Sequence, residues 1–341
     1  MKKLILLNLL FLGTLFSQDY YYSKYAPFDN DIMSPEEFLG YPIGEMHTRH
    51  DLIVSYMEYL SDNSDKADIF QYATSYEGRK LIYIILSSPD KIDNVEEIRK
   101  SHISYLKPEY DDYNDSPKPD NFPIIINLGY NVHGNEPSSS EAAMLTAYTL
   151  VASKSEEIQG YLENSIVLID PTINPDGRDR HTQWVNSYKS SPLVDDPQDA
   201  EHNEYWPGGR TNHYWFDLNR DVLLGIHPET RGKINFHHDW YPNVTMDFHE
   251  MGTNSTYFFV PWKTHAAKDP VIPQENYEYF ETLFGSYFAK GLDEIGSMYF
   301  SKEAFDKTYP GYHSSYADLL GGIGMLFEQA SSRGHKQKTQ F

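Results

Sequence analysis

The stretch YNVHGNEPSSSE, residues 130–141, decides how the rest of the chain is interpreted. It follows an apolar run at 124–128 that predicts a buried strand, and it leads into a helix-like stretch at 138–153. Two residues separate His133 from Glu136, so an imidazole and a carboxylate on one tight loop can reach the same ion. Gly134 and Asn135 suit the unusual backbone that such a loop needs. This spacing is common by chance, so the rest of the chain must supply the other parts of a metal site.

Strand-like and helix-like segments alternate on both sides of this loop. The apolar patterns predict strands at 67–72, 80–87, 124–128, 165–170, 244–248, 257–261 and 324–327, helices at 50–60, 138–153 and 276–291, and a loop at 185–211. This alternation predicts an α/β fold, a mixed and largely parallel central sheet flanked by helices. Ligand sites in such sheets lie at the carboxyl ends of the strands, and His133, Asp176, His249 and Glu328 all follow predicted strands.

Composition excludes several classes of function. The 341 residues carry a formal net charge of −22, which disfavours nucleic acid and anionic membrane surfaces as partners. There is no cysteine, so disulfides, iron–sulfur clusters, cysteine-ligated zinc and thiol catalysis are excluded. Any metal site must therefore use histidine and carboxylate ligands.

The N-terminus has the pattern of an export signal. Lys2 and Lys3 precede an apolar run at 4–16, and Ser17 offers a small residue for cleavage. We therefore expect a signal peptide at 1–17, a polar lead-in at 18–45 and a catalytic domain at 46–341. This predicts a secreted or periplasmic protein that has no membrane association after signal cleavage.

Three further motifs contain residue types that suit a metal-dependent hydrolase. His249, in DFHE at 247–250, can be a third metal ligand, with Asp247 or Glu250 behind it. Two histidines and one carboxylate leave a coordination position for water, as in catalytic zinc sites. Glu328 closes an apolar strand and suits a general base beside that water. The motif DLNR at 217–220 places an arginine beside an amide, a pair suited to holding a free carboxylate.

Taken in order along the chain, these motifs resemble the zinc carboxypeptidases of the carboxypeptidase A type. The matching pieces are HGNE at 133–136, NPDG at 174–177, DLNR at 217–220, DFH at 247–249 and GMLFE at 324–328. The resemblance implies one Zn²⁺ per chain, held by His133, Glu136 and His249. It also implies that Glu328 is the general base and that Asn219 and Arg220 bind the terminal carboxylate of a peptide or protein substrate.

The chain departs from the family pattern in several places. An arginine that stabilises the oxyanion is expected a short way after NPDG, and Arg180 is favoured over Arg178, Asn186 and Lys189. The substrate-capping tyrosine is assigned to Tyr309, with Tyr312 and Tyr316 as competitors. His313 and Asp318 are candidates for the floor of the side-chain pocket. Only 13 residues follow Glu328, which indicates a domain truncated at its C-terminus.

We therefore expect an exported metallocarboxypeptidase that hydrolyses C-terminal peptide bonds by zinc-activated water. One alternative is an amidase that uses the same zinc site on murein peptides or another substrate. A second alternative is a non-catalytic peptide- or glycan-binding module on a carboxypeptidase-like fold. Such a module should lack a ligand or the base, and this chain lacks neither.

Overall fold

The computed structural model describes residues 22–106, 122–262 and 269–340. The signal peptide predicted at 1–17 lies outside these residues, as does the start of the predicted lead-in. Among the described residues, no helix combines the length and the apolar character needed to cross a membrane.

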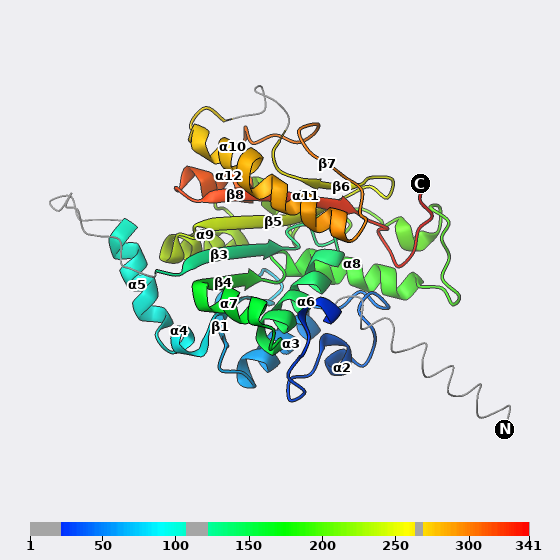
Figure 1. Ribbon diagram of the computed structural model, residues 1–341. Coiled ribbons are helices and arrows are strands. Elements are labelled where there is room, and N and C mark those ends of the chain that lie inside the picture. The colour runs from blue at the N-terminus through cyan, green and yellow to red at the C-terminus, as the bar shows by residue number, and fades with distance from the viewer. Residues whose placement is uncertain (1–21, 107–121, 263–268, 341) are drawn as a thin grey trace.

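A single eight-stranded sheet runs through the molecule (Figure 1). Its order is β1-β2-β4-β3-β5-β8-β6-β7. The strands are β1 (Ala67–Thr74), β2 (Lys80–Leu86), β3 (Ile124–Tyr130), β4 (Ser165–Asp170), β5 (Val244–Met251), β6 (Tyr257–Phe259), β7 (Tyr299–Phe300) and β8 (Ile323–Ala330). The central strands β4, β3, β5 and β8 are mutually parallel, whereas β2 and β6 join them antiparallel. The predicted mixed, largely parallel sheet is confirmed.

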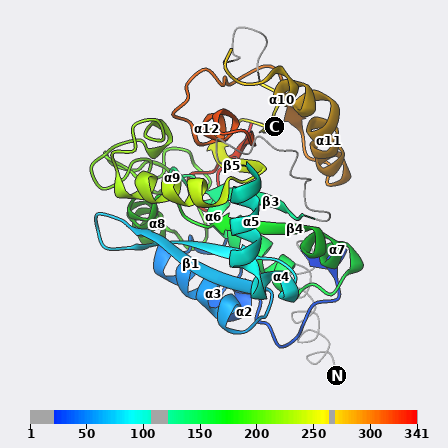
Figure 2. The same ribbon diagram turned by 90° about the vertical axis from the view of Figure 1, so that its left-hand side faces the viewer.

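Helices cover both faces of the sheet (Figure 2). The helical segments are η1 (Ser23–Tyr25), α2 (Pro35–Leu39), α3 (His50–Asp62), α4 (Pro89–Asp93), α5 (Val95–Leu106), α6 (Ser138–Ala152), α7 (Glu156–Asn164), α8 (Pro175–Tyr188), η2 (Ala200–His202), η3 (Leu218–Arg220), α9 (Pro228–Trp240), α10 (Gln274–Tyr279), the π-helical η5 (Phe280–Phe284), α11 (Gly285–Glu294) and α12 (His313–Leu319).

Each face of the sheet has its own apolar core. Helices α3, α6 and α7 pack on one face, where Met57, Met144 and Leu162 are buried against strand residues such as Ile84. Helices α5 and α9 lie on the other face, where Phe236 stacks on Tyr83 with ring centroids 3.7 Å apart. The central strands are buried on both faces of the sheet, which explains why their sequences are nearly continuous apolar runs.

The structure differs from the sequence prediction at several element bounds. Helix α8 occupies part of the segment predicted as a loop, and α9 was not predicted. Both helices are mostly polar and begin with proline at the first turn, so their apolar periodicity is weak. Strands β5 and β8 run past their predicted ends, which places His249 and Glu328 inside strands instead of after them.

Candidate active site

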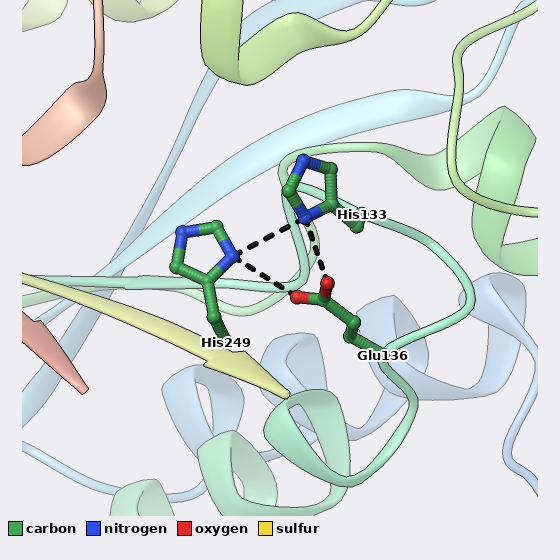
Figure 3. Close-up of side chains that lie close together, drawn as sticks. All are labelled: His133, Glu136 and His249. Carbon is green, nitrogen blue, oxygen red and sulfur yellow. Dashed lines mark hydrogen bonds and ion pairs between the residues drawn. The ribbon is translucent and has the colours of Figure 1, made fainter. Parts of the chain in front are cut away.

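Two histidines and a glutamate converge at the carboxyl edge of the sheet (Figure 3). His133 and Glu136 lie in the loop after β3, and His249 lies near the end of β5. The Oε1 atom of Glu136 is 2.9 Å from Nδ1 of His133, and its Oε2 atom is 3.0 Å from Nδ1 of His249. Within the described part of the chain, this is the one group of three such side chains whose donor atoms all lie within 4.8 Å of one another.

The donor set fits a divalent metal of the zinc type. The two Nδ1 atoms lie 3.2 Å apart, close to the roughly 3.3 Å that two nitrogen ligands of a tetrahedral zinc would show. The opposite nitrogen of each ring is held by a carboxylate. Nε2 of His133 lies 3.0 Å from Asp217 Oδ1, and Nε2 of His249 lies 2.8 Å from Asp247 Oδ2. Such pairing fixes the ring orientation and leaves both Nδ1 atoms facing the same point.

The electrostatics of the group also favour a cation. Burial alone would raise the pKa of Glu136, but the facing rings of His133 and His249 hold it well below its usual range. Burial alone would lower the pKa of His249, but Asp247 and Glu136 raise it well above its usual value. The buried carboxylates of Glu136 and Asp247 and the half-buried carboxylate of Asp217 thus surround two imidazoles, and the excess negative charge stabilises positive charge at this point.

Local hydrogen bonds shape the loop that carries His133 and Glu136. Asn131 adopts a left-handed conformation, with φ of 59°. Its side-chain amide donates to the carbonyls of His133 (2.9 Å) and Glu136 (2.8 Å). Asparagine tolerates this conformation better than most residues. The unusual backbone predicted at Gly134 and Asn135 is therefore found at Asn131.

Gly134 is required for close packing against the NPDG motif. A Cβ atom there would collide with the backbone of Gly177 and Arg178. The NPDG segment itself starts α8, where the side chain of Asn174 caps the helix by accepting the N–H of Gly177 at 2.9 Å. Two motifs far apart in the sequence thus meet backbone to backbone and set the position of the loop that carries His133 and Glu136.

A pocket of about 290 Å³ opens over the three residues. It is lined by His133, Glu136, Arg210, Asn219, Arg220, His249, Glu250, Met251, Phe305, Asp306, Tyr312, Ser314, Leu326 and Glu328. The structure therefore brings Glu328, Asn219 and Arg220 into the same pocket as the metal-ligand candidates.

Glu328 is the acid–base candidate in this pocket. It lies on β8 opposite His249 of β5 and is 9% exposed. Burial raises its pKa to about 7, and the opposing effect of His249 does not cancel this rise. A carboxyl group with a pKa near neutrality can both accept and return a proton.

Asn219 and Arg220 lie in η3 on another wall of the pocket. Asn219 is buried, and its Oδ1 accepts the backbone N–H of His313 at 3.0 Å. Arg220 is exposed, and its guanidinium lies 4.7 Å from the centre of the Tyr312 ring. Its fixed position against an aromatic face leaves its outward N–H groups available to a ligand.

Tyr309 does not line the pocket, whereas Tyr312 does. The hydroxyl of Tyr309 donates to the carbonyl of Arg220 at 2.9 Å, and its ring meets that of Tyr312 edge-on. Tyr309 therefore holds the loop beside Arg220 in this structure. Of the three tyrosines considered for the capping role, Tyr312 is the one that lines the pocket, and Tyr316 instead contacts His238.

Arg180, predicted to stabilise the oxyanion, does not line the pocket. Its guanidinium donates to the carbonyls of Gly208 (2.7 Å) and Asn212 (3.2 Å), so it braces a loop. Arg210, on that same loop, lines the pocket. Its guanidinium is 2.9 Å from Asp217 and 3.5 Å from Glu136. Sequence reasoning missed Arg210 because it lies more than thirty residues after NPDG, although its place seven residues before DLNR was a usable signal.

His313 and Asp318, the candidates for the pocket floor, are buried elsewhere. Asp318, in α12, pairs with Lys307 and accepts a hydrogen bond from the Asn276 amide at 2.6 Å. The backbone N–H of His313 contacts Asn219, and burial of the His313 ring lowers the pKa of this imidazole to about 3. The acidic side chain that does line the pocket beyond Glu136, Glu250 and Glu328 is Asp306.

Comparison with known proteins adds the family to this geometry. The zinc carboxypeptidase family model matches residues 53–316. Comparison with curated protein sequences found no match.

Solved structures share the fold at low sequence identity. A carboxypeptidase A from Helicoverpa armigera is 15% identical with a TM-score of 0.55, over 93% of this chain and 71% of that one. A metallo-carboxypeptidase from Burkholderia cenocepacia is 11% identical with a TM-score of 0.53, over 82% and 60%. One from Pseudomonas aeruginosa, in complex with (2-guanidinoethylmercapto)succinic acid, is 13% identical with a TM-score of 0.51, over 82% and 59%. The chain thus spans about three fifths of the bacterial structures.

Proposed function

The chain belongs to the zinc carboxypeptidase family, and on that premise we propose that it is an exported zinc metallocarboxypeptidase. It would remove C-terminal residues from peptides or proteins, using one zinc ion per chain. One observation carries the proposal. A single pocket contains the His133–Glu136–His249 group, the buried carboxyl of Glu328 and the Asn219–Arg220 pair.

The protein groups have distinct parts in the proposed reaction. Arg220 and the Asn219 amide hold the terminal carboxylate, which fixes the last peptide bond beside the metal ligands. Zinc, when bound, polarises the scissile carbonyl and lowers the pKa of a water. Glu328 accepts the proton of the attacking water and delivers it to the leaving amine. The guanidinium of Arg210 offers positive charge to the oxygen on which negative charge develops.

The proposed export depends on residues 1–17 and on their pattern alone. The basic start, the apolar run and the small residue at Ser17 support it. Detection of the mature N-terminus by Edman sequencing in a secreting host would test this part separately.

The test of the proposed activity is mass spectrometry of a mixed peptide library after incubation with the zinc-loaded protein. We expect the loss of single C-terminal residues from free peptides and no loss from the same peptides with amidated C-termini. The Glu328→Gln variant is the matched control, because it keeps the size of the side chain but cannot accept a proton. Intact free peptides in the presence of bound zinc would refute the proposal.

A further inference from the structure

Two tryptophans stand exposed on the loop that carries Arg210. Trp206 is 75% exposed and Trp215 is 56% exposed, and their ring centroids lie 4.5 Å apart at an interplanar angle of 59°. Tryptophan is usually largely buried in folded proteins, and a paired exposed set is uncommon. We call this pair the aromatic rim.

Hydrogen bonds from neighbouring side chains hold the loop that carries the aromatic rim. Arg180 donates to the carbonyls of Gly208 and Asn212, as described above. Glu204 accepts the backbone N–H of Gly209 at 3.1 Å and the side-chain amide of Asn135 at 2.9 Å. These contacts fix the loop between the two tryptophans, so the rim is displayed by a supported scaffold.

Trp215 is also held in a strained conformation. Its φ is 63°, in the left-handed region that bulky residues rarely adopt. Asn212 enforces this turn, because its carbonyl accepts the N–H of Trp215 at 3.1 Å and its side-chain oxygen accepts the N–H groups of Tyr214 (3.0 Å) and Phe216 (3.1 Å). Strain of this kind in a well-supported loop is typical of ligand-contacting positions.

The rim belongs to the loop that also reaches the candidate active site. Trp215 is two residues before Asp217, whose carboxylate contacts His133, and two residues of extended chain span at most about 7 Å. Trp206 is four residues before Arg210, whose guanidinium lines the pocket. One loop therefore carries a cation that lines the pocket and two exposed indoles a few residues away along the chain.

We propose that Trp206 and Trp215 bind the segment of a peptide substrate that lies N-terminal to the scissile bond. This inference rests on the proposed carboxypeptidase function. If Arg220 holds the terminal carboxylate and Arg210 flanks the scissile carbonyl, the upstream residues pass the loop that carries Arg210. An extended peptide advances about 3.3 Å per residue, so residues upstream of the cut extend along this loop toward the rim.

The chemistry of the rim selects the kind of substrate. Two tilted indoles form an apolar notch that suits an aromatic or prolyl side chain. The net charge of −22 disfavours acidic peptides. The favoured substrate is therefore an extended peptide with aromatic or prolyl residues shortly before its C-terminus, and the enzyme would discriminate by length as well as by the terminal residue.

The experiment compares two substrates that share the same two C-terminal residues. One is an N-blocked dipeptide, and the other is an octapeptide with phenylalanine placed in turn at each upstream position. For the Trp206→Ala and Trp215→Ala variants, we expect the ratio of kcat/KM for the octapeptide to that for the dipeptide to fall roughly fivefold, mainly through KM. The Trp215→Phe variant should recover most of that ratio. Tyr287→Ala, an exposed aromatic on α11, is the matched control and should leave the ratio unchanged.

The outcomes separate this inference from the proposed function. If the unmodified protein cleaves neither substrate, the proposed function fails. If it cleaves both and the tryptophan variants leave the ratio unchanged, or lose activity equally on both, the docking role is refuted.

Discussion

Replacing Glu328 by glutamine should make the metal-free protein more stable and remove its activity. Burial raises the pKa of Glu328 from 4.5 to about 7. At low pH the side chain is protonated in both the folded and unfolded states, so the variant and the unmodified protein should be equally stable. As the pH rises from 4.5 toward 7, the unfolded state releases its proton first, and the unmodified protein loses stability that the neutral glutamine keeps.

The size of this effect follows from the rise in pKa. A rise of about 2.5 in pKa corresponds to about 3 kcal/mol once the folded carboxyl is fully ionised. The stability advantage of Glu328→Gln should therefore grow from less than about 1 kcal/mol near pH 5 to about 3 kcal/mol near pH 8.

Denaturant unfolding in EDTA at both pH values measures this difference, and Glu303→Gln, at an exposed position, is the control. Added zinc should shrink the advantage, because a nearby dication favours the ionised carboxyl. An advantage that does not change with pH, or a variant that is less stable at high pH, would refute the assignment of Glu328 as a buried carboxyl poised near neutrality.

Three further predictions concern side chains around the metal ligands. Asp247→Asn should weaken zinc binding about 10- to 100-fold, because the amide cannot anchor the His249 ring in the same tautomer. Competition with a chromophoric chelator measures the affinity, and an unchanged affinity would contradict the ring-anchoring role. Arg210→Ala should lower kcat about 100-fold or more in steady-state assays, with little change in KM, as expected for a group that stabilises developing charge. A change in KM alone would instead assign Arg210 to substrate binding. Arg220→Ala should raise KM for free peptides while zinc content by metal analysis stays the same, and an unaltered KM would remove Arg220 from carboxylate recognition.

The parts of the site that sequence predicted are those fixed by short-range chemistry. His133 and Glu136 are placed by one loop, and His249 and Glu328 lie on neighbouring parallel strands, where the register sets them opposite each other. Strand-end residues of a parallel sheet converge whatever the loops do. The sheet and the convergence of His133, Glu136 and His249 were therefore predictable from apolar runs and motif spacing.

The parts that sequence could not place depend on loops that cross the sheet edge. Arg180 and Arg210 both follow NPDG in the sequence, and only the path of the chain decides which of the two lines the pocket. Tyr309 and Tyr312 lie on the same short loop. The hydrogen bond from the Tyr309 hydroxyl to the Arg220 carbonyl decides which of the two rings lines the pocket. No periodicity in the sequence encodes such choices, because they are set by tertiary contacts.

The two arginines nevertheless depend on each other. Arg180 holds the carbonyls on both sides of Arg210, and this bracing keeps the loop in the shape that turns Arg210 toward Glu136. The residue predicted for charge stabilisation thus positions the residue that is suited to it. Loss of Arg180 would free the loop and misplace the Arg210 guanidinium. The same loop joins the two exposed tryptophans, so their positions would change as well. The motif-based prediction named a residue that serves the site through its neighbour, and only the fold distinguishes that support from direct contact.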